Sequence, residues 1–230
     1  MKSESSGNEY VRIIPRRFSG VVRVPASKSH SIRQLFIASL ADGVSEIFNP
    51  LDSLDTRSCV SACRAFGAEI AECRAVDNEG KNPNLPNEKG EKLVKWEIRG
   101  NNGFKQKAVI PNVQIDAGNS GTTLFFALAA AGLQLAPVIF TGDEQIQRRT
   151  AAPLLESLTG LGIQCVSRKG CVPITIKGPW KGGRVSLSCH TSQYLSSLLI
   201  ASPLAPSGTV TEIEVPLLNE RPYIEMTRSY

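Results

Sequence analysis

The sequence repeats one order of secondary-structure elements, and this repetition restricts the possible folds more than any other feature. From residue 21 the hydrophobic pattern predicts strands and helices in the order strand, helix, strand, helix, strand, strand: 21–24, 29–40, 44–48, 55–66, 68–74 and 93–99. A polar run at 77–92, without an apolar period, separates the last two strands and is predicted to be a long exposed loop. A βαβαββ unit of this kind is typical of an α/β fold.

The same order returns twice further along the chain. The corresponding elements are predicted at 113–116, 118–133, 137–141, 149–161, 164–167 and 173–177, and then at 183–189, 191–201, 210–215 and from Pro222 onward. We therefore expect one α/β domain over residues 20–230, built from three repeats at about 21–100, 113–178 and 183–230. Each repeat supplies a strand-to-helix turn, and we expect the helix N-termini at these turns to converge on a common centre.

The first strand-to-helix turn gathers positive charge at the start of a helix. Lys28 precedes the predicted helix and Arg33 lies one turn inside it, while Ser29 or Ser31 can cap the free N–H groups. Two cations and the positive end of a helix dipole together favour a phosphate or a carboxylate. An ordinary capped helix with solvated basic side chains explains the same residues equally well.

The equivalent turns of the later repeats also offer hydrogen-bond donors. The turn at 118–123 consists of small residues, and Gly121 would let an anion approach the main chain closely. Arg148 and Arg149 precede the next helix, and either guanidinium can form a fork with a carboxylate or phosphate. Residues 191–193 (Thr, Ser, Gln) place donors at a third helix start. Their coincidence at matching positions of successive repeats predicts a shared anion site.

Charge and composition favour small anionic ligands over nucleic acid. The 26 Lys and Arg residues exceed the 21 Asp and Glu residues by five, and this excess is scattered without a long basic run. The polar N-terminus lacks an apolar signal core and no apolar run could span a bilayer, so a cytoplasmic location without a membrane partner is predicted. The six cysteines include no Cys-x-x-Cys pair, which predicts buried free thiols in place of zinc ligands or disulfides.

A series of motifs, in chain order, resembles the enolpyruvylshikimate-phosphate synthases (EPSP synthases), the 3-phosphoshikimate 1-carboxyvinyltransferases of chorismate synthesis. The motifs are Ala26-Ser-Lys-Ser-His-Ser-Ile-Arg33, Gly118-Asn-Ser-Gly-Thr-Thr123, Thr141-Gly-Asp143, Arg149, Thr191-Ser-Gln-Tyr-Leu-Ser-Ser-Leu-Leu199 and Arg221-Pro-Tyr-Ile-Glu-Met-Thr227. The resemblance runs from about residue 13 to the end. It implies one lobe of an inside-out α/β barrel, in which each of two lobes has three βαβαββ repeats and the substrates lie between the lobes.

The resemblance also implies a reaction and the residues that serve it. The family transfers the enolpyruvyl group of phosphoenolpyruvate to the 5-hydroxyl of shikimate-3-phosphate and releases phosphate, without a metal or organic cofactor. Lys28 would contact both substrates and is the predicted catalytic residue. The predicted ligands of shikimate-3-phosphate are Lys28, Ser29, Arg33, Thr191, Ser192, Gln193 and Tyr223. Those of phosphoenolpyruvate are Lys28, Asn119, Gly121, Thr122 and Arg149.

Three residues depart from the family pattern. Phe125 stands where an arginine is common, which predicts a less cationic or differently braced enolpyruvate site. Glu220 stands where a serine usually helps to bind phosphoshikimate, and its carboxylate would repel the phosphate unless it turned away. Thr191 replaces a more usual serine but keeps the hydroxyl.

Family members are close to twice as long as this chain. Residues 1–19 would belong to the second lobe, which also supplies an acidic base and further phosphoenolpyruvate ligands. We therefore expect the isolated chain to bind phosphoshikimate but to turn over little or nothing. Two alternatives remain open. One is a lobe of the related transferase that acts on UDP-N-acetylglucosamine, although Lys28-Ser29 argues against it, and the other is a non-catalytic binding module that complements a separately encoded lobe.

Overall fold

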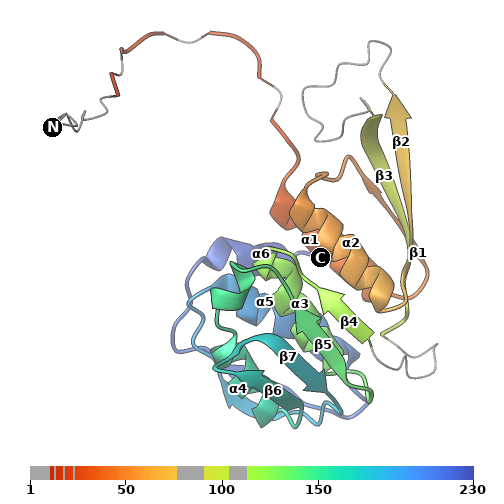
Figure 1. Cartoon of the computed structure of the whole chain (residues 1–230). Coiled ribbons are helices and arrows are strands. Elements are labelled where there is room, and N and C mark those ends of the chain that lie inside the picture. Colours follow the sequence, from red (N-terminus) through yellow and green to blue (C-terminus); the bar gives the residue numbers. More distant parts are fainter. Residues whose placement is uncertain (1–10, 13, 18, 23, 77–90, 104–112) are drawn as a thin grey trace, which may run out of the picture.

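The structure is a computed structural model that describes residues 11–12, 14–17, 19–22, 24–76, 91–103 and 113–230. Much of the predicted N-terminal segment and nearly all of the predicted loop at 77–92 lie outside the described residues. The described part of the chain contains three sheets and a central group of helices (Figure 1).

Each sheet comes from one predicted repeat. The first is antiparallel with strand order β1-β3-β2, from β1 (Val44–Phe48), β2 (Glu69–Val76) and β3 (Glu91–Arg99). The second has the order β4-β5-β7-β6, from β4 (Val113–Asp116), β5 (Val138–Thr141), β6 (Gln164–Arg168) and β7 (Cys171–Lys177). The third pairs β8 (Gly183–Ser186) with β9 (Thr211–Glu214) in parallel. In the second sheet β4 and β5 are likewise parallel, with Val113 opposite Val138.

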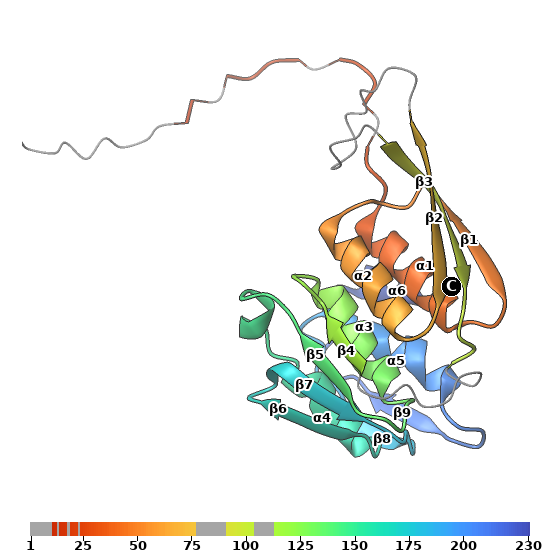
Figure 2. The ribbon, with the colours of Figure 1, turned by 45° about the vertical axis from the view of Figure 1, so that its right-hand side comes forward.

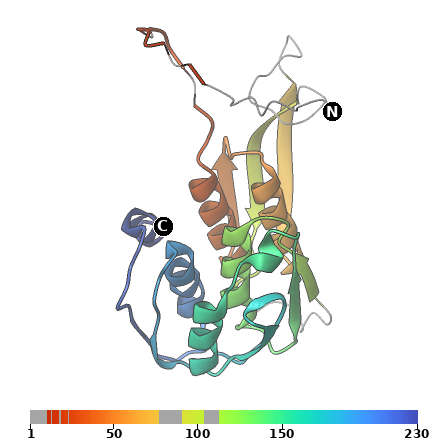
Figure 3. The same ribbon diagram turned by 60° about the vertical axis from the view of Figure 1, so that its left-hand side comes forward.

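The helices fill the space between the sheets, as Figures 1 and 2 show for α1, α2, α3 and α5. Their bounds are α1 (Lys28–Leu40), α2 (Leu54–Ala65), α3 (Gly121–Ala131), α4 (Ala152–Gly160), α5 (Ser192–Ala201) and α6 (Arg221–Arg228), with short 3-10 helices η1 (Ile146–Arg148) and η2 (Ser202–Leu204). Figure 3 shows α6 beside α5, near the C-terminal end of the chain. Among the described residues no helix is long and apolar enough to cross a bilayer.

Helix α3 forms the centre of the core. Ten of its eleven residues are buried, because α3 packs against α5, α2 and α1 and against strands of the second sheet. A helix enclosed on all sides has to be apolar all round, and α3 is built from Leu, Phe and Ala after its polar first turn. Each Leu or Phe side chain buried there stabilises the fold by about 1.5–3 kcal/mol. One continuous apolar cluster extends from α3 into all three repeats.

The strand predicted at 21–24 does not form in the residues of that segment that the structure describes. Residues 21, 22 and 24 belong to no helix or strand, and Val21 and Val22 are 102% and 83% exposed. In the other repeats the first strand gains its hydrogen bonds from a parallel neighbour, as β4 does from β5 and β8 from β9. Among the described strands β1 pairs with β3 alone, so its other edge carries no such neighbour.

The predicted caps of the first helix were also wrong. Helix α1 begins at Lys28, because the side chain of Ser27 accepts a hydrogen bond from the His30 N–H at 3.4 Å. Ser31 is buried, and its hydroxyl instead accepts from the Leu51 N–H at 2.9 Å. Lys28 therefore lies inside the first turn, where its side chain and the free N–H groups share one end of the helix.

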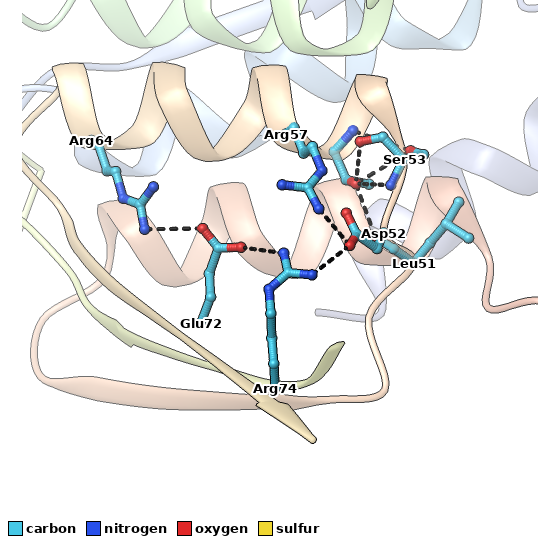
Figure 4. A network of polar contacts seen from close by, with 8 residues as sticks. Leu51, Asp52, Ser53, Arg57, Arg64, Glu72 and Arg74 are labelled. Carbon is cyan, nitrogen blue, oxygen red and sulfur yellow. Dashed lines mark hydrogen bonds and ion pairs between the residues drawn. The ribbon is translucent and has the colours of Figure 1, made fainter. Parts of the chain in front are cut away.

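An alternating ion network ties α2 to the first sheet (Figure 4). The carboxylate of Asp52, whose side chain is 5% exposed, accepts from Arg57 at 2.6 Å and from Arg74 at 3.1 Å. Glu72 then links Arg74 to Arg64, at 3.2 and 3.1 Å. Because neighbouring charges alternate in sign, the network holds β2 against the exposed side of α2 and fixes the start of that helix.

All six cysteines are free thiols. Cys59 and Cys63 are buried on one face of α2 with their sulfur atoms 4.0 Å apart, and a hydrogen bond between them together with burial raises the pKa of Cys59. No group of side chains in the described ranges could hold a metal ion.

Candidate functional site

The starts of four helices meet at one polar cavity of about 240 Å³. Its lining residues are Lys28 of α1, Asp55 of α2, Asn119, Gly121 and Thr122 at the start of α3, Arg149 after η1, and Gln193 of α5. Each helix turns its free N–H end toward the same region, where the dipoles favour negative charge. All five residues predicted for phosphoenolpyruvate therefore lie together, with Gln193 beside them.

The charges at this cavity leave a positive excess. Lys28 Nζ lies 2.7 Å from a carboxylate oxygen of Asp55, with the lysine side chain half exposed. Arg149 is exposed and forms no ion pair with any residue that the structure describes. Since two cations face one carboxylate, the cavity can accept a further anion.

Short polar contacts hold the cavity walls in place. The Gln193 side-chain amide donates to the Thr122 hydroxyl at 3.0 Å, which joins the starts of α5 and α3. Asn119 donates to Gln145 at 2.9 Å. Gly121 leaves room for Arg149, because a Cβ added at Gly121 would lie 3.1 Å from a terminal guanidinium nitrogen of Arg149. The lack of a side chain at Gly121 thus lets the Arg149 and Gln193 side chains lie close to the start of α3.

Arg33 forms a second, buried cationic centre. Its side chain donates to Thr227 at 2.8 Å, to Ser196 at 3.2 Å and to the Ser29 carbonyl at 3.3 Å. The guanidinium carbon also lies 5.6 Å from the centre of the Tyr223 ring. Burial lowers the pKa of Arg33, and the nearby Glu220 carboxylate opposes that shift. The group remains a cation, because a guanidinium is effectively always protonated in proteins.

The residues at the start of α5 hold a carboxylate of the protein itself. One oxygen of Glu220 accepts from the Ser192 N–H at 3.0 Å, from the Ser192 hydroxyl at 2.9 Å and from the Thr191 hydroxyl at 3.4 Å. The Ser192 N–H bond is the main cause that lowers the pKa of Glu220, helped by both hydroxyls and by Arg33. The side chain predicted to interfere with a phosphate is thus turned toward α5.

Comparison with known proteins decides the family of the chain. Residues 13–230 match the family model of EPSP synthase (3-phosphoshikimate 1-carboxyvinyltransferase). The chain belongs to the EPSP synthase family. A relative from Acetivibrio thermocellus named 3-phosphoshikimate 1-carboxyvinyltransferase is 42% identical over 222 residues, which cover 94% of this chain and 46% of the relative. A relative of the same name from Methanothermobacter thermautotrophicus is 37% identical, covering 97% and 46%.

Solved structures agree with this assignment. Two structures of EPSP synthase from Acinetobacter baumannii have TM-scores of 0.67 and 0.66 and are 25% and 26% identical. Each covers 92% of this chain, and the chain covers 43% and 44% of them. The predicted fold class, one α/β lobe of an enolpyruvyl transferase, is confirmed. The chain spans about half the length of the curated relatives it matches.

Within this EPSP synthase lobe, three residues that contact the predicted site residues were not themselves predicted. Asp55 pairs with Lys28, and Ser196 and Thr227 hold Arg33. For Asp55, the only indication in the sequence was its place as an acidic residue in the first turn of a predicted helix. Phe125 is 4% exposed and packs edge-on against Tyr194 with ring centres 4.9 Å apart, so it braces the helices behind the cavity and does not line it.

Proposed function

We propose that this chain forms the shikimate-3-phosphate-binding half of a 3-phosphoshikimate 1-carboxyvinyltransferase. In this reaction the 5-hydroxyl oxygen bonds to the central carbon of phosphoenolpyruvate, the methylene carbon takes up a proton, and the hydroxyl proton passes to a base. Phosphate then leaves with its bridging oxygen, and loss of a proton from the new methyl group restores the double bond.

The observation that supports this proposal best is that the starts of four helices line one cavity. Two substrates that each carry several negative charges have to lie side by side, so the site needs fixed positive charge and oriented donors. Lys28 and Arg149 line the cavity, and Arg33 adds a cation on the same helix as Lys28. Helix N–H ends supply donors without a reorganisation cost.

In the proposed arrangement Lys28 contacts both substrates. Asn119, Gly121, Thr122 and Arg149 hold phosphoenolpyruvate, while Ser29, Arg33, Thr191, Ser192, Gln193 and Tyr223 hold shikimate-3-phosphate. The cavity of about 240 Å³ is smaller than the roughly 300–1,000 Å³ of typical small-molecule sites, so this half does not enclose two substrates. The 230-residue chain alone is therefore expected to bind shikimate-3-phosphate and to turn over little.

Calorimetric titration tests the ligand assignment. Shikimate-3-phosphate should bind with measurable heat at millimolar concentration, whereas UDP-N-acetylglucosamine, the substrate of the related transferase, should not. Absence of heat and of chemical-shift change with shikimate-3-phosphate would contradict the proposal, and preference for the nucleotide sugar would favour the related enzyme.

Two neighbouring arginines provide a matched test of the phosphoenolpyruvate half. Arg148 and Arg149 are both exposed, but only Arg149 lines the cavity. With shikimate-3-phosphate present, R149Q should weaken phosphoenolpyruvate binding by about tenfold or more, the size of a lost charge-assisted hydrogen bond, while R148Q should change it by less than about twofold. Equal effects would show that only net charge matters.

Complementation tests the catalytic role. The chain, mixed with a separately produced second lobe of a relative, should release phosphate from phosphoenolpyruvate in a manner that depends on shikimate-3-phosphate. Binding without phosphate release in the mixture would favour a non-catalytic binding module. Full turnover by the chain alone would refute the proposal that it is half of the site.

A further inference from the structure

Glu220 occupies the donors at the start of α5 as a bound anion would. Its backbone lies at the N-cap of α6, and one carboxylate oxygen accepts all three hydrogen bonds from Thr191 and Ser192. The contact is with a backbone N–H and two hydroxyls of the neighbouring helix, at a separation of 28 to 29 residues along the chain. This is the geometry in which a helix start holds a carboxylate or phosphate oxygen.

The backbone of Glu220 supports this orientation. Glu220 has φ +57°, in the left-handed region that residues other than glycine rarely adopt. In this conformation the side chain of Glu220 points in a different direction from the one it would have in the ordinary helical conformation. Buried Arg33 lies close enough to attract the carboxylate, and Arg33 also contacts Tyr223, three residues after Glu220. The left-handed backbone and the hydrogen bonds from Thr191 and Ser192 together hold this carboxylate at the start of α5.

The start of α5 offers only a limited number of hydrogen-bond donors to a ligand. Thr191 and Ser192 are residues that the proposed function assigns to shikimate-3-phosphate, and one oxygen of Glu220 already takes the Ser192 N–H and both hydroxyl groups. A phosphate and a carboxylate cannot share these groups, since both are acceptors and both are negative. Glu220 is exposed on its other side, so its side chain can rotate into solvent without unpacking the core.

We propose that Glu220 is an internal competitor for the phosphate subsite on α5, which a phosphorylated ligand must displace before it binds. The inference rests on the proposed function for the identity of the ligand. Every anion that binds to these donors must first displace the carboxylate, so Glu220 lowers the affinity of this subsite for anions. Glu220 therefore sets the affinity of this subsite for anions.

Binding to E220Q and E220A tests the proposal, with E225Q as the matched control. Glu225 lies on the same helix α6 and pairs with Arg228 and Arg221 at the surface, so E225Q removes the same charge away from the subsite. The probes are shikimate-3-phosphate and inorganic phosphate, each followed by the NMR shift of the Ser192 amide. Thermal unfolding of each variant verifies that it is folded. If the glutamine of E220Q still occupies the donors of Thr191 and Ser192, E220A provides the test in its place.

Removal of the carboxylate should tighten binding of both probes by about tenfold or more, since a like charge a few ångströms from the phosphate is lost, and E225Q should change it by less than about twofold. Without ligand, the Ser192 amide shift should differ between wild type and E220A but not between wild type and E225Q.

Equal affinities of the wild type and both Glu220 variants for shikimate-3-phosphate would overturn the inference while leaving the proposed function intact. Tighter phosphate binding by E220Q or E220A without any shikimate-3-phosphate binding would support the inference and overturn the proposed substrate. Failure of all variants to bind either anion would overturn both.

Discussion

Arg33 shows how one residue can serve both the core and the site. Its exposed fraction is 2%, and its guanidinium joins α1 to α5 and α6 through Ser196 and Thr227 while facing the ring of Tyr223. Arginine suits this position because its planar group offers several donors in fixed directions. The hydrogen bonds to Ser196 and Thr227 also fix the orientation of this buried cation.

The conservative change R33K should therefore be costly. Lysine supplies one ammonium on an unbranched stem and cannot reach the three partners of Arg33 at once, which leaves buried groups unsatisfied. We expect the free energy of unfolding to fall by about 2–3 kcal/mol, measured by urea denaturation. R99K is the control, because Arg99 is exposed and pairs with Glu69 at 3.7 Å, and it should cost less than about 1 kcal/mol. Similar losses for both would mean that the bonds of Arg33 add little.

The contact of Glu220 with α5 also predicts a pH dependence of stability. Hydrogen bonds from Ser192 lower the pKa of Glu220 in the folded chain below its ordinary value. The carboxylate therefore stabilises the fold at pH values above the ordinary glutamate pKa of about 4.3, and this contribution is lost as the pH falls through the lower, folded-state pKa. The melting temperature of wild type should exceed that of E220Q at pH 7, and the difference should shrink below about pH 4. A difference that stays constant from pH 7 to pH 3 would contradict this account.

At the scale of elements, local sequence patterns determined most of the fold. The strands predicted at 44–48 and 113–116 have these same bounds in the structure. The helix predicted from 149 begins only at Ala152, because Ile146–Arg148 form a 3-10 turn and Pro153 is accommodated in the first helical turn. Such differences of a few residues arise at helix ends, where local propensity is weak.

Interactions between distant residues were the part that the sequence could not predict. The turn positions of Lys28, Gly121 and Gln193 follow from local patterns, but the partners of Arg33 lie 163 and 194 residues away. The segment at 21–24 has the composition of a strand, yet pairing requires a neighbouring strand that no local pattern reveals. Whether this segment pairs depends on the edge of β1 that has no partner among the described strands, and that edge exists only in the assembled sheet.

A matched pair of valines tests whether the 21–24 segment is unpaired in solution. Val22 is 83% exposed, whereas Val113, at the start of the corresponding strand β4, is 5% exposed. V113T places a hydroxyl in the core and should lower the free energy of unfolding by about 1–3 kcal/mol, while V22T should change it by less than about 0.5 kcal/mol. If V22T were as destabilising as V113T in chemical denaturation, the segment would have to be packed, most simply against β1.

At the scale of the whole molecule, the cavity exists only because three repeats share one core. No single repeat contains the residues that line the cavity, which come from α1 and α2 of the first repeat, α3 and Arg149 of the second, and α5 of the third. Helix α3 touches helices of both other repeats, so the relative positions of the helix starts depend on the packing around it. The geometry of the site and the stability of the core are therefore coupled.

Two buried tryptophans can test whether the repeats unfold together. Trp96 lies in β3 of the first sheet and is 1% exposed, while Trp180 precedes the third sheet, is 2% exposed and donates to Thr211 at 3.1 Å. W180F leaves Trp96 as the only fluorescent indole and W96F leaves Trp180, so each variant reports on a different repeat. Because one continuous apolar cluster includes both indoles, the urea midpoint from fluorescence should match the midpoint from far-UV circular dichroism within each variant. Comparison within a variant removes the effect of the substitution on overall stability.

If the Trp96 signal were lost at lower urea than the circular dichroism in W180F, the first repeat would unfold by itself. Lys28 and Arg33, on α1, would then leave the site before the rest of the fold melts.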